Sequence, residues 1–235
     1  MKPLWICIIG LVMLSSCSIF KGSGKSKKEK ELEVKENQIE EVEKEVVEKP
    51  SSPPEEMLAS FLKEYVNIKY KKYKFEMYLF VSVKYQNMYL IEDDAILKKY
   101  KISTAANGAG NDYGSEQTPI GLHRVKNKIG HNVPEGGLFQ SRVYAGKTAK
   151  IYTDNTKSPT DDITTRIMWL EGMESGLNKG GKVDSYNRYI YIHGTSEEGL
   201  IGTPQSHGCI RMKNADIVEL FSIIPEGTPV LILNY

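Results

Sequence analysis

The sequence predicts a mainly β domain with a few peripheral helices, preceded by a segment of different composition. Short runs in which apolar and polar residues alternate, separated by turn residues, are typical of strands. A net charge of +1 and 40% hydrophobic residues are those of an ordinary globular protein. A domain of about 175 residues buries roughly 70% of the surface of its unfolded chain, which is enough for a stable core.

Residues 1–16 are predicted to be a lipoprotein signal peptide. Lys2 precedes an apolar run from Leu4 to Leu14, which is shorter than the about 20 residues that a membrane-spanning helix needs. The run ends in L-S-S-C and resembles a bacterial lipobox, which implies cleavage before Cys17 and a lipid on that cysteine. An ordinary signal peptide or a short uncleaved anchor is the alternative. In each case we expect an exported protein in an oxidising compartment.

Residues 17–55 are predicted to be a charged tether, partly helical or disordered. Lys and Glu alternate after Lys21, and a proline cluster from Pro50 to Pro54 closes the segment. Four apolar residues share one helical stripe, so a short coiled coil is the alternative: Leu32, Ile39, Val42 and Val46. A solvated linker accounts for this composition best.

The domain that follows, residues 56–235, is expected to open with a helix over Glu55 to Tyr73. Its apolar residues recur at spacings of three and four: Met57, Leu58, Phe61, Leu62, Tyr65 and Ile68. The period then changes to two on both sides of a turn at Gln86-Asn87, which predicts a β-hairpin. Asp93-Asp94 is a second turn, and Leu97 to Ser103 is a further strand candidate.

Later strands are expected after Thr118, over Tyr189 to His193, from Cys209 to Met212 and over Val230 to Leu233. Asn214 is predicted to cap a helix that Pro225 and Gly227 end, with Ile217, Val218, Phe221 and Ile224 on its buried side. Polar, glycine-containing stretches at 107–114, 131–137, 153–162 and 176–181 are predicted loops. Loops of such length often form lids or binding walls.

The cysteines are three, and two of them fall in the predicted signal region, Cys7 and Cys17. Cys209 therefore has no disulfide partner in the domain. An unpaired cysteine in an exported protein is either buried and inert or reactive. Its surroundings favour reactivity, because it lies in S-H-G-C-I-R-M and a second histidine, His193, opens an H-G-T run upstream.

Strand alternation places the two groups where they can meet. In an extended Cys209 to Met212, Cys209 and Arg211 face one side while Ile210 and Met212 enter the core. By the same rule, the side chains of His193 and Ile192 point to opposite sides of their strand. A histidine beside a thiol can take its proton, and an imidazolium lowers the thiol's pKa from about 8.5, which leaves a thiolate–imidazolium pair. Gly208 leaves room for backbone N–H groups to face an oxyanion. These features suit acyl transfer.

H-G-T at His193 to Thr195, followed by S-H-G-C-I-R-M at Ser206 to Met212, resembles the signature of L,D-transpeptidase catalytic domains of the YkuD type. T-P-I-G at Thr118 to Gly121 is similar to a further element of that family, and the resemblance covers roughly Leu79 to the C-terminus. It implies a YkuD-like mixed β-sandwich. The glycine-rich loops near Gly108 and at 176–181 depart from a compact member of the family.

The resemblance implies an enzyme that acts on peptidoglycan stem peptides without a cofactor. Cys209 would attack the carbonyl of the third residue, release D-alanine and pass the acyl group to an amine, which gives 3→3 cross-links or an attachment. His193 would be the general base and acid. The remaining site residues would orient it or shape the oxyanion and substrate site: Gly194, Thr195, Ser206, His207, Gly208 and Arg211. Inhibition by carbapenems through Cys209 is also implied.

Several alternatives remain at this point. The same site could hand the acyl group to water, as an L,D-carboxypeptidase or a peptidoglycan hydrolase, or the chain could be a non-catalytic wall-binding lipoprotein. A zinc site would need His193, His207 and Cys209 with His123 or His131, but the usual ligand spacings are missing, so no metal is expected. A near-neutral charge offers no nucleic-acid footprint. The protein is expected to be a monomer, and Ser18 after the lipid cysteine resembles a signal for the outer membrane, facing the periplasm.

Overall fold

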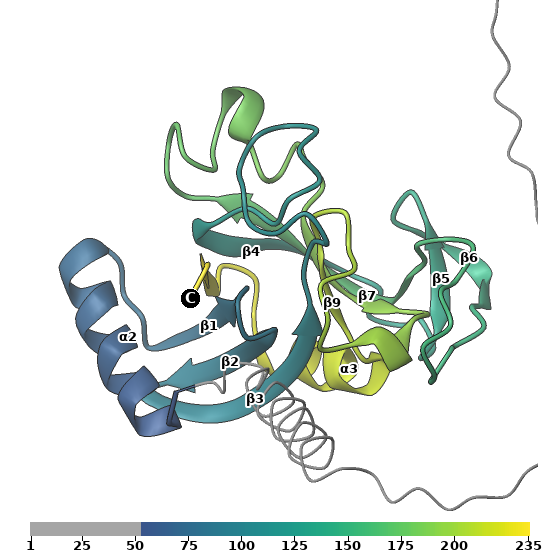
Figure 1. Ribbon diagram of the computed structural model, residues 1–235, viewed down its shortest axis with the longest axis horizontal. Coiled ribbons are helices and arrows are strands. Elements are labelled where there is room, and N and C mark those ends of the chain that lie inside the picture. The colour runs from purple at the N-terminus through teal and green to yellow at the C-terminus, as the bar shows by residue number, and fades with distance from the viewer. Residues whose placement is uncertain (1–52) are drawn as a thin grey trace, which may run out of the picture. The chain divides into compact units, whose positions relative to one another are not determined.

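The structure is a computed structural model, and it describes residues 53–235 (Figure 1). The predicted signal peptide, Cys17 and nearly all of the predicted tether lie outside the described residues. The elements in chain order are α2 (Glu55–Lys69), β1 (Met77–Ser82), β2 (Asn87–Glu92), β3 (Ala95–Ser103), β4 (Gly121–Ile129), β5 (Gly137–Gln140), β6 (Val143–Thr148), β7 (Ile163–Gly172), η1 (Gly181–Val183), β8 (Tyr191–Thr195), η2 (Glu198–Leu200), β9 (Ile210–Met212), α3 (Asn214–Ile223) and β10 (Pro229–Leu233).

In the described residues, ten strands form one sheet in the order β4-β10-β1-β2-β3-β9-β8-β7-β5-β6. An additional pairing of β4 with β7 closes this sheet into a ring that leaves out only the β5–β6 hairpin. Strand β10 runs parallel to β1, and β9 runs parallel to β8, while the other neighbours are antiparallel. The predicted mainly β domain with peripheral helices is confirmed. The two layers expected of a β-sandwich belong to one continuous sheet.

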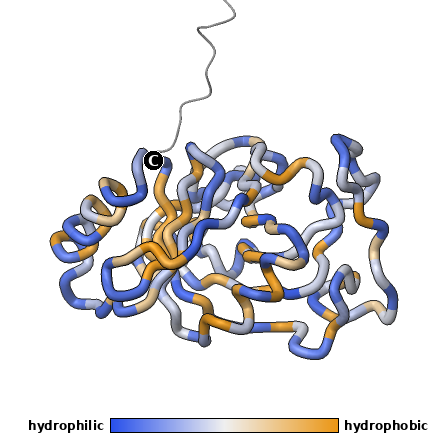
Figure 2. Tube along the Cα trace, turned by 90° about the horizontal axis from the view of Figure 1, so that it is seen from below, coloured by the Kyte–Doolittle hydropathy of each residue, from blue (hydrophilic) through white to orange (hydrophobic). Residues whose placement is uncertain are grey.

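Alternation along the strands separates an inner core from outer clusters. In β1, Leu79 and Val81 belong to the core inside the ring, whereas Tyr78 and Phe80 pack outward beneath α2. In β8 and β9, Ile192, Ile210 and Met212 join the inner core, as predicted. In Figure 2 several hydrophobic segments run side by side left of the centre, and others are spread over the lower part of the view. Helix α3 completes the inner core through Ile217, Leu220 and Phe221.

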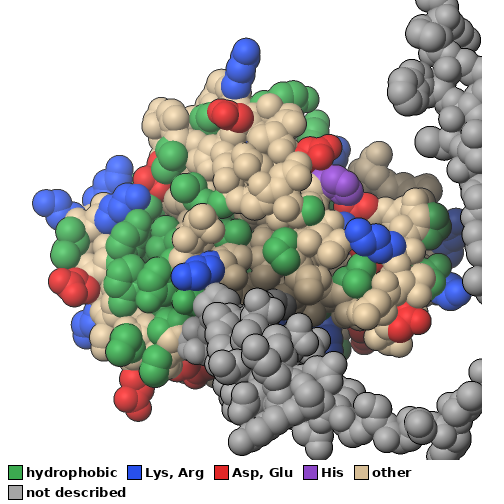
Figure 3. Space-filling view, viewed as in Figure 1, with side chains coloured by type: hydrophobic (Ala, Val, Ile, Leu, Met, Phe, Trp, Pro, Cys, Tyr) green, Lys and Arg blue, Asp and Glu red, His purple; other side chains and the backbone are tan. Residues whose placement is uncertain are grey.

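Helix α2 is shorter than its sequence predicts, and fewer of its apolar residues are buried than its pattern contains. It ends at Lys69 rather than Tyr73, and it buries Leu58, Leu62 and Val66, which follow each other four residues apart. Met57 and Ile68 belong to the apolar pattern that predicted the helix, but they are 63% and 69% exposed. The helix contacts the sheet along one stripe, so neighbouring apolar residues stay on the surface, and hydrophobic side chains gather on the α2 side in Figure 3.

Strands β5, β6 and β7 were not predicted. Strand β7 contains a register shift between Thr164 and Ile167, and Thr165 has φ 67° there, which breaks the alternation that marks a strand. Strand β6 is largely exposed, so it carries little apolar pattern. Asn214 is the first residue of α3 instead of its cap. Its side chain accepts a hydrogen bond from Thr164 Oγ1 at 2.6 Å and so ties α3 to β7.

None of the described helices is both long enough and apolar enough to cross a membrane.

A buried histidine should make the stability of this fold depend on pH. His123 is fully buried in β4, between the Gly121 carbonyl and Ser185 Oγ, 2.9 Å from its Nε2. Burial lowers its pKa to about 4, whereas an unfolded histidine titrates near 6.5. As pH falls from about 6.5 to about 4, the unfolded chain binds a proton that the folded chain refuses. Stability is therefore full above this window and is lost within it, by up to about 3 kcal/mol for this histidine.

Urea unfolding between about pH 7 and about pH 4.5 measures this loss. We expect His123→Gln to flatten the fall in the free energy of unfolding. The exposed His131 is the matched control, and His131→Gln should leave the wild-type slope intact. An unchanged slope in His123→Gln would contradict the assignment.

Candidate active site

A tight turn before β9 positions Cys209. Ser206 Oγ donates to the Cys209 carbonyl at 2.6 Å and accepts the Gly208 N–H at 3.2 Å. Gly208 has φ 133°, and a Cβ there would lie 3.2 Å from Ile190 Cδ1, so both conformation and space favour glycine. The serine and the glycine of S-H-G-C are therefore explained as the residues that shape the turn.

The T-P-I-G segment is fastened to the same turn. Thr118 is fully buried, and its Oγ1 donates to the Gly208 carbonyl at 3.0 Å while accepting the Ala105 N–H at 2.9 Å. One hydroxyl thus joins the loop after β3 to the cysteine turn, although Thr118 and Gly208 are 90 positions apart in the chain.

The Cys209 thiol lies on the outer face of the ring. The residue is half-buried and packs against an outer apolar cluster of Phe139, Ile167 and Tyr191. Its Sγ donates to the Tyr189 carbonyl and accepts the Tyr191 N–H, each at 3.4 Å. Tyr189, which has φ 58°, takes the left-handed conformation that large side chains rarely adopt.

His193 lies on the neighbouring strand and on the same outer face, since Ile192 points into the core. The register pairs His193 with Arg211, which is two residues after Cys209. The imidazole is therefore displaced from the thiol by two residues along the strand direction. Its Nδ1 is 2.6 Å from the Gly194 carbonyl, so the backbone contact expected from Gly194 or Thr195 falls on Gly194. A carbonyl only accepts, which places the proton of the neutral ring on Nδ1 and leaves the lone pair on Nε2. Among residues 53–235, no hydrogen bond joins His193 to Cys209.

Both groups are neutral at pH 7 in this conformation. Burial lowers the pKa of His193 to about 4, against the raising effect of Asp161. Burial raises the pKa of Cys209 to about 12, and the Tyr191 N–H opposes that shift only in part. The expected thiolate–imidazolium pair is therefore not the resting state, because desolvation disfavours both charges and the two groups are not in contact.

Arg211 is buried rather than directed to an open site. It is 3% exposed, its Nη1 donates to Glu197 Oε2 at 2.7 Å, and its Nη2 lies 2.5 Å from Asp161 Oδ1. Arg211 lies on the same outer side of its strand as Cys209, because Ile210 and Met212 enter the core, as predicted. Asp161 and Glu197 cover it there, and the two carboxylates pair with the buried guanidinium. Glu197 Oε1 also accepts the Ser158 N–H at 2.7 Å. Arg211 thus fastens the 153–162 loop to β9.

Asp161 connects this network to both histidines of the signature. Its Oδ2 lies 2.8 Å from Nδ1 of His207, whose side chain is 65% exposed. Burial alone would raise the pKa of Asp161, but Arg211, His193 and His207 together lower it. A fixed anion near His193 favours the imidazolium, the state that the ring reaches on accepting a proton. Asp161 and Glu197 carry no local sequence signal, and only the folded loop brings them to the site.

The remaining predicted site residues are placed as follows. Thr195 is buried, its Oγ1 accepts the Glu197 N–H at 3.1 Å, and its carbonyl accepts Asn214 Nδ2 at 2.9 Å. The Gly208 N–H is engaged by Ser206, so the N–H group that faces the thiol is that of Tyr191, which the sequence did not indicate. The residues that the zinc alternative needs do not assemble, and the described residues contain no group of three or more metal-ligating side chains.

A pocket of about 210 Å³ lies beside the cysteine turn. Its lining comes from the turn, from the loop after β3 and from the segment before β8: Tyr113, Gly114, Glu116, Arg188, Tyr189, Ile190 and His207. Arg188 links the latter two segments by donating to the carbonyls of Asn111 at 2.8 Å and Gln117 at 2.6 Å. Figure 1 shows these loops together above β4.

Removal of the Thr118 hydroxyl should loosen the cysteine turn. Thr118→Val keeps the shape of the side chain but leaves the Ala105 N–H and the Gly208 carbonyl without their partner. We expect the free energy of unfolding to fall by about 2 kcal/mol, and alkylation of Cys209 by iodoacetamide to accelerate in the folded protein. Thr148→Val, at an exposed threonine of β6, is the control. Wild-type stability together with a wild-type alkylation rate in Thr118→Val would refute this role.

The comparisons with known proteins agree with these features. The model of the L,D-transpeptidase catalytic domain family, YkuD, matches residues 76–232. The protein provisionally named L,D-transpeptidase YkuD of Bacillus subtilis is 45% identical over 60 residues, which are 23% of this chain and 37% of that protein. The one provisionally named L,D-transpeptidase YqjB of the same organism is 56% identical over 47 residues, 20% of this chain and 27% of that protein. The chain thus spans about a third or less of these relatives.

Among solved structures, an L,D-transpeptidase from Xylanimonas cellulosilytica matches with a TM-score of 0.42 and 19% identity, over 67% of this chain and 60% of that chain. This likeness is too low to carry the assignment. The match of the family model over most of the described domain does carry it. The chain belongs to the YkuD family of L,D-transpeptidase catalytic domains.

Proposed function

We propose that this protein is a cysteine-dependent acyltransferase acting on peptidoglycan stem peptides. The observation that carries the proposal is the placement of an unpaired, half-buried thiol and a histidine with its lone pair on Nε2 on one face of two adjacent parallel strands. Family membership supplies the substrate class, since L,D-transpeptidases act on stem peptides.

The first half-reaction forms a thioester. Cys209 Sγ attacks the carbonyl carbon of the third stem residue while its proton passes to His193 Nε2, and the carbonyl oxygen becomes an oxyanion. The Tyr191 N–H, 3.4 Å from Sγ, is a donor within reach of that oxygen. When the tetrahedral species collapses, the C–N bond breaks, His193 returns its proton to the departing amine, and D-alanine leaves.

The second half-reaction releases the acyl group. An acceptor amine attacks the thioester carbonyl, His193 Nε2 removes a proton from the amine, and the thiol is restored as Cys209 leaves. Because both groups start neutral, proton transfer accompanies attack instead of preceding it. The substrate must also bring Cys209 and His193 together, since the register leaves them two positions apart. Asp161 stabilises the imidazolium in both steps.

Product analysis with a purified disaccharide-tetrapeptide tests the proposal. Wild type should release D-alanine and show a transient mass increase on Cys209, while Cys209→Ser should release none by this route. His193→Gln should lower kcat by about 10²- to 10⁴-fold, and His131→Gln, at an exposed histidine, should not. Cross-linked dimer as product indicates transpeptidation, and tripeptide alone indicates carboxypeptidation. D-Alanine release that does not depend on Cys209, or no release from any muropeptide, would refute the proposal.

We also propose that Cys17 carries a lipid that anchors the domain to a bacterial membrane, with the outer membrane facing the periplasm as its location. The apolar run that ends in L-S-S-C at Cys17 supports this. Metabolic labelling with an alkyne fatty acid in a bacterial host should label wild type but not Cys17→Ala, and the variant should leave the membrane fraction. Equal labelling of both proteins would count against lipidation at Cys17.

A further inference from the structure

The turn between β5 and β6 holds an arginine in an unfavourable conformation. Gln140 pairs with Val143, so Ser141 and Arg142 form a two-residue hairpin turn. Both have positive φ, 47° and 70°. Such turns strongly favour Asn-Gly, because side chains other than those of Asn and Asp resist this conformation. Strain of this kind is often retained where it aims a functional group.

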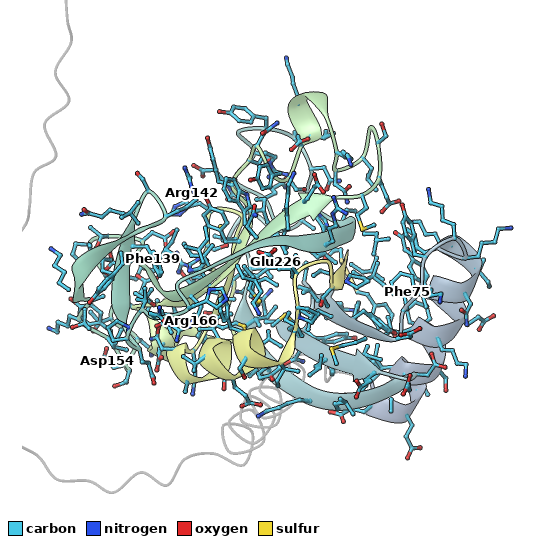
Figure 4. All side chains as sticks on the ribbon, turned by 180° about the vertical axis from the view of Figure 1, so that it is seen from behind. Phe75, Phe139, Arg142, Asp154, Arg166 and Glu226 are labelled. Carbon is cyan, nitrogen blue, oxygen red and sulfur yellow. The ribbon has the colours of Figure 1, made fainter. Side chains whose placement is uncertain are left out.

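The turn aims the Arg142 guanidinium at aromatic rings next to the thiol. Its Cζ lies 4.9 Å from the centroid of the Trp169 ring and 5.1 Å from that of Tyr189, and Nη1 donates to Tyr191 OH at 3.3 Å. Figure 4 shows Arg142 on the side of the domain that carries Phe139, away from Phe75 beside α2. These cation–π contacts and the hydrogen bond to Tyr191 hold the guanidinium beside the rings.

The charge of Arg142 is not balanced within the described domain. Arg124 and Arg211 are paired with carboxylates, and Arg166 and Arg188 donate to backbone carbonyls. Among residues 53–235, no carboxylate forms an ion pair with Arg142, and the side chain remains partly exposed. Arg142 is therefore a cation beside the thiol that an anion from outside the domain can reach.

Two tyrosines connect Arg142 directly to the reacting thiol. Tyr191 touches Cys209 Sγ with its backbone N–H and Arg142 with its phenol oxygen. Tyr189 contacts Sγ with its carbonyl and carries Arg142 over its ring. The guanidinium and the thiol thus lie at opposite ends of Tyr191.

We propose that Arg142 binds a carboxylate of the donor peptide and thereby sets the register in which the scissile carbonyl meets Cys209. This inference rests on the proposed function, because the ligand is the donor of that reaction. A planar guanidinium suits a carboxylate in bidentate geometry. Two carboxylates of a stem tetrapeptide lie within one residue of the scissile bond: the C-terminal group of the leaving D-alanine, and the side-chain group of a diaminopimelate in the third position.

Binding to the full chain carrying Cys209→Ala, measured by calorimetry, tests the inference without turnover. Three donors are compared: a diaminopimelate tetrapeptide, the same peptide amidated at its C-terminus, and a tetrapeptide with lysine in the third position. We expect Arg142→Gln to raise the Kd of the first donor about 10- to 100-fold, as loss of a charge-assisted hydrogen bond does. Arg142→Lys should restore part of the affinity, and Lys147→Gln, at an exposed cation of the same hairpin, should change nothing.

The donor that lacks the recognised carboxylate identifies it. That donor should bind equally well with Arg142 present and in the Arg142→Gln variant, which is the coupling expected of a direct contact. An equal loss of affinity for all three donors in Arg142→Gln would mean that Arg142 only packs against its neighbours, which would overturn the inference. No loss of affinity for any donor, or no binding of any donor, would overturn it as well. Turnover with Cys209 present separates this from the proposed reaction: binding that depends on Arg142 without release of D-alanine would refute the reaction alone.

Discussion

The thiol and the imidazole share one outer face because β8 and β9 run parallel in a fixed register. Ile192 pairs with Ile210, both enter the core, and the residues on either side of them must therefore point outward. A slip of one residue would turn either Cys209 or His193 into the core. Burial of the two isoleucines thus determines where Cys209 and His193 lie relative to each other.

Other residues of the two motifs hold Cys209 in this position. Ser206 and Gly208 form the turn that delivers Cys209, and Thr118 ties that turn to the loop after β3. Arg211 is held on the outer face by Asp161 and Glu197, which would be unpaired carboxylates without it. Through these contacts Arg211 joins the 153–162 loop to the strand that follows the thiol.

Sequence was informative where a pattern is local and less so where a contact is distant. The β1–β2 hairpin, the α3 helix and the facing of Ile210 and Met212 follow from periodicity alone, so each was predictable. Strand β7 was not predicted because the bulge at Thr165 interrupts its alternation of apolar and polar residues. Strand β6 was not predicted because it is exposed and carries little apolar pattern. Asp161 and Arg142 reach the site only through tertiary folding, and no local pattern marks them, whereas Tyr191 belongs to the predicted strand of His193 but its N–H contact with the thiol was not predicted. The neutral state of the Cys209–His193 pair likewise depends on burial, which spacing does not reveal.

The raised pKa of Cys209 has a consequence for the lifetime of the protein. Burial raises the pKa of the Cys209 thiol well above its usual range, so the thiol form predominates at pH 7. Peroxides and disulfides react with the thiolate, so a lone cysteine held in this way resists conversion to sulfenic acid or to a mixed disulfide. The desolvation that disfavours ionisation of Cys209 therefore also protects its sulfur from oxidation.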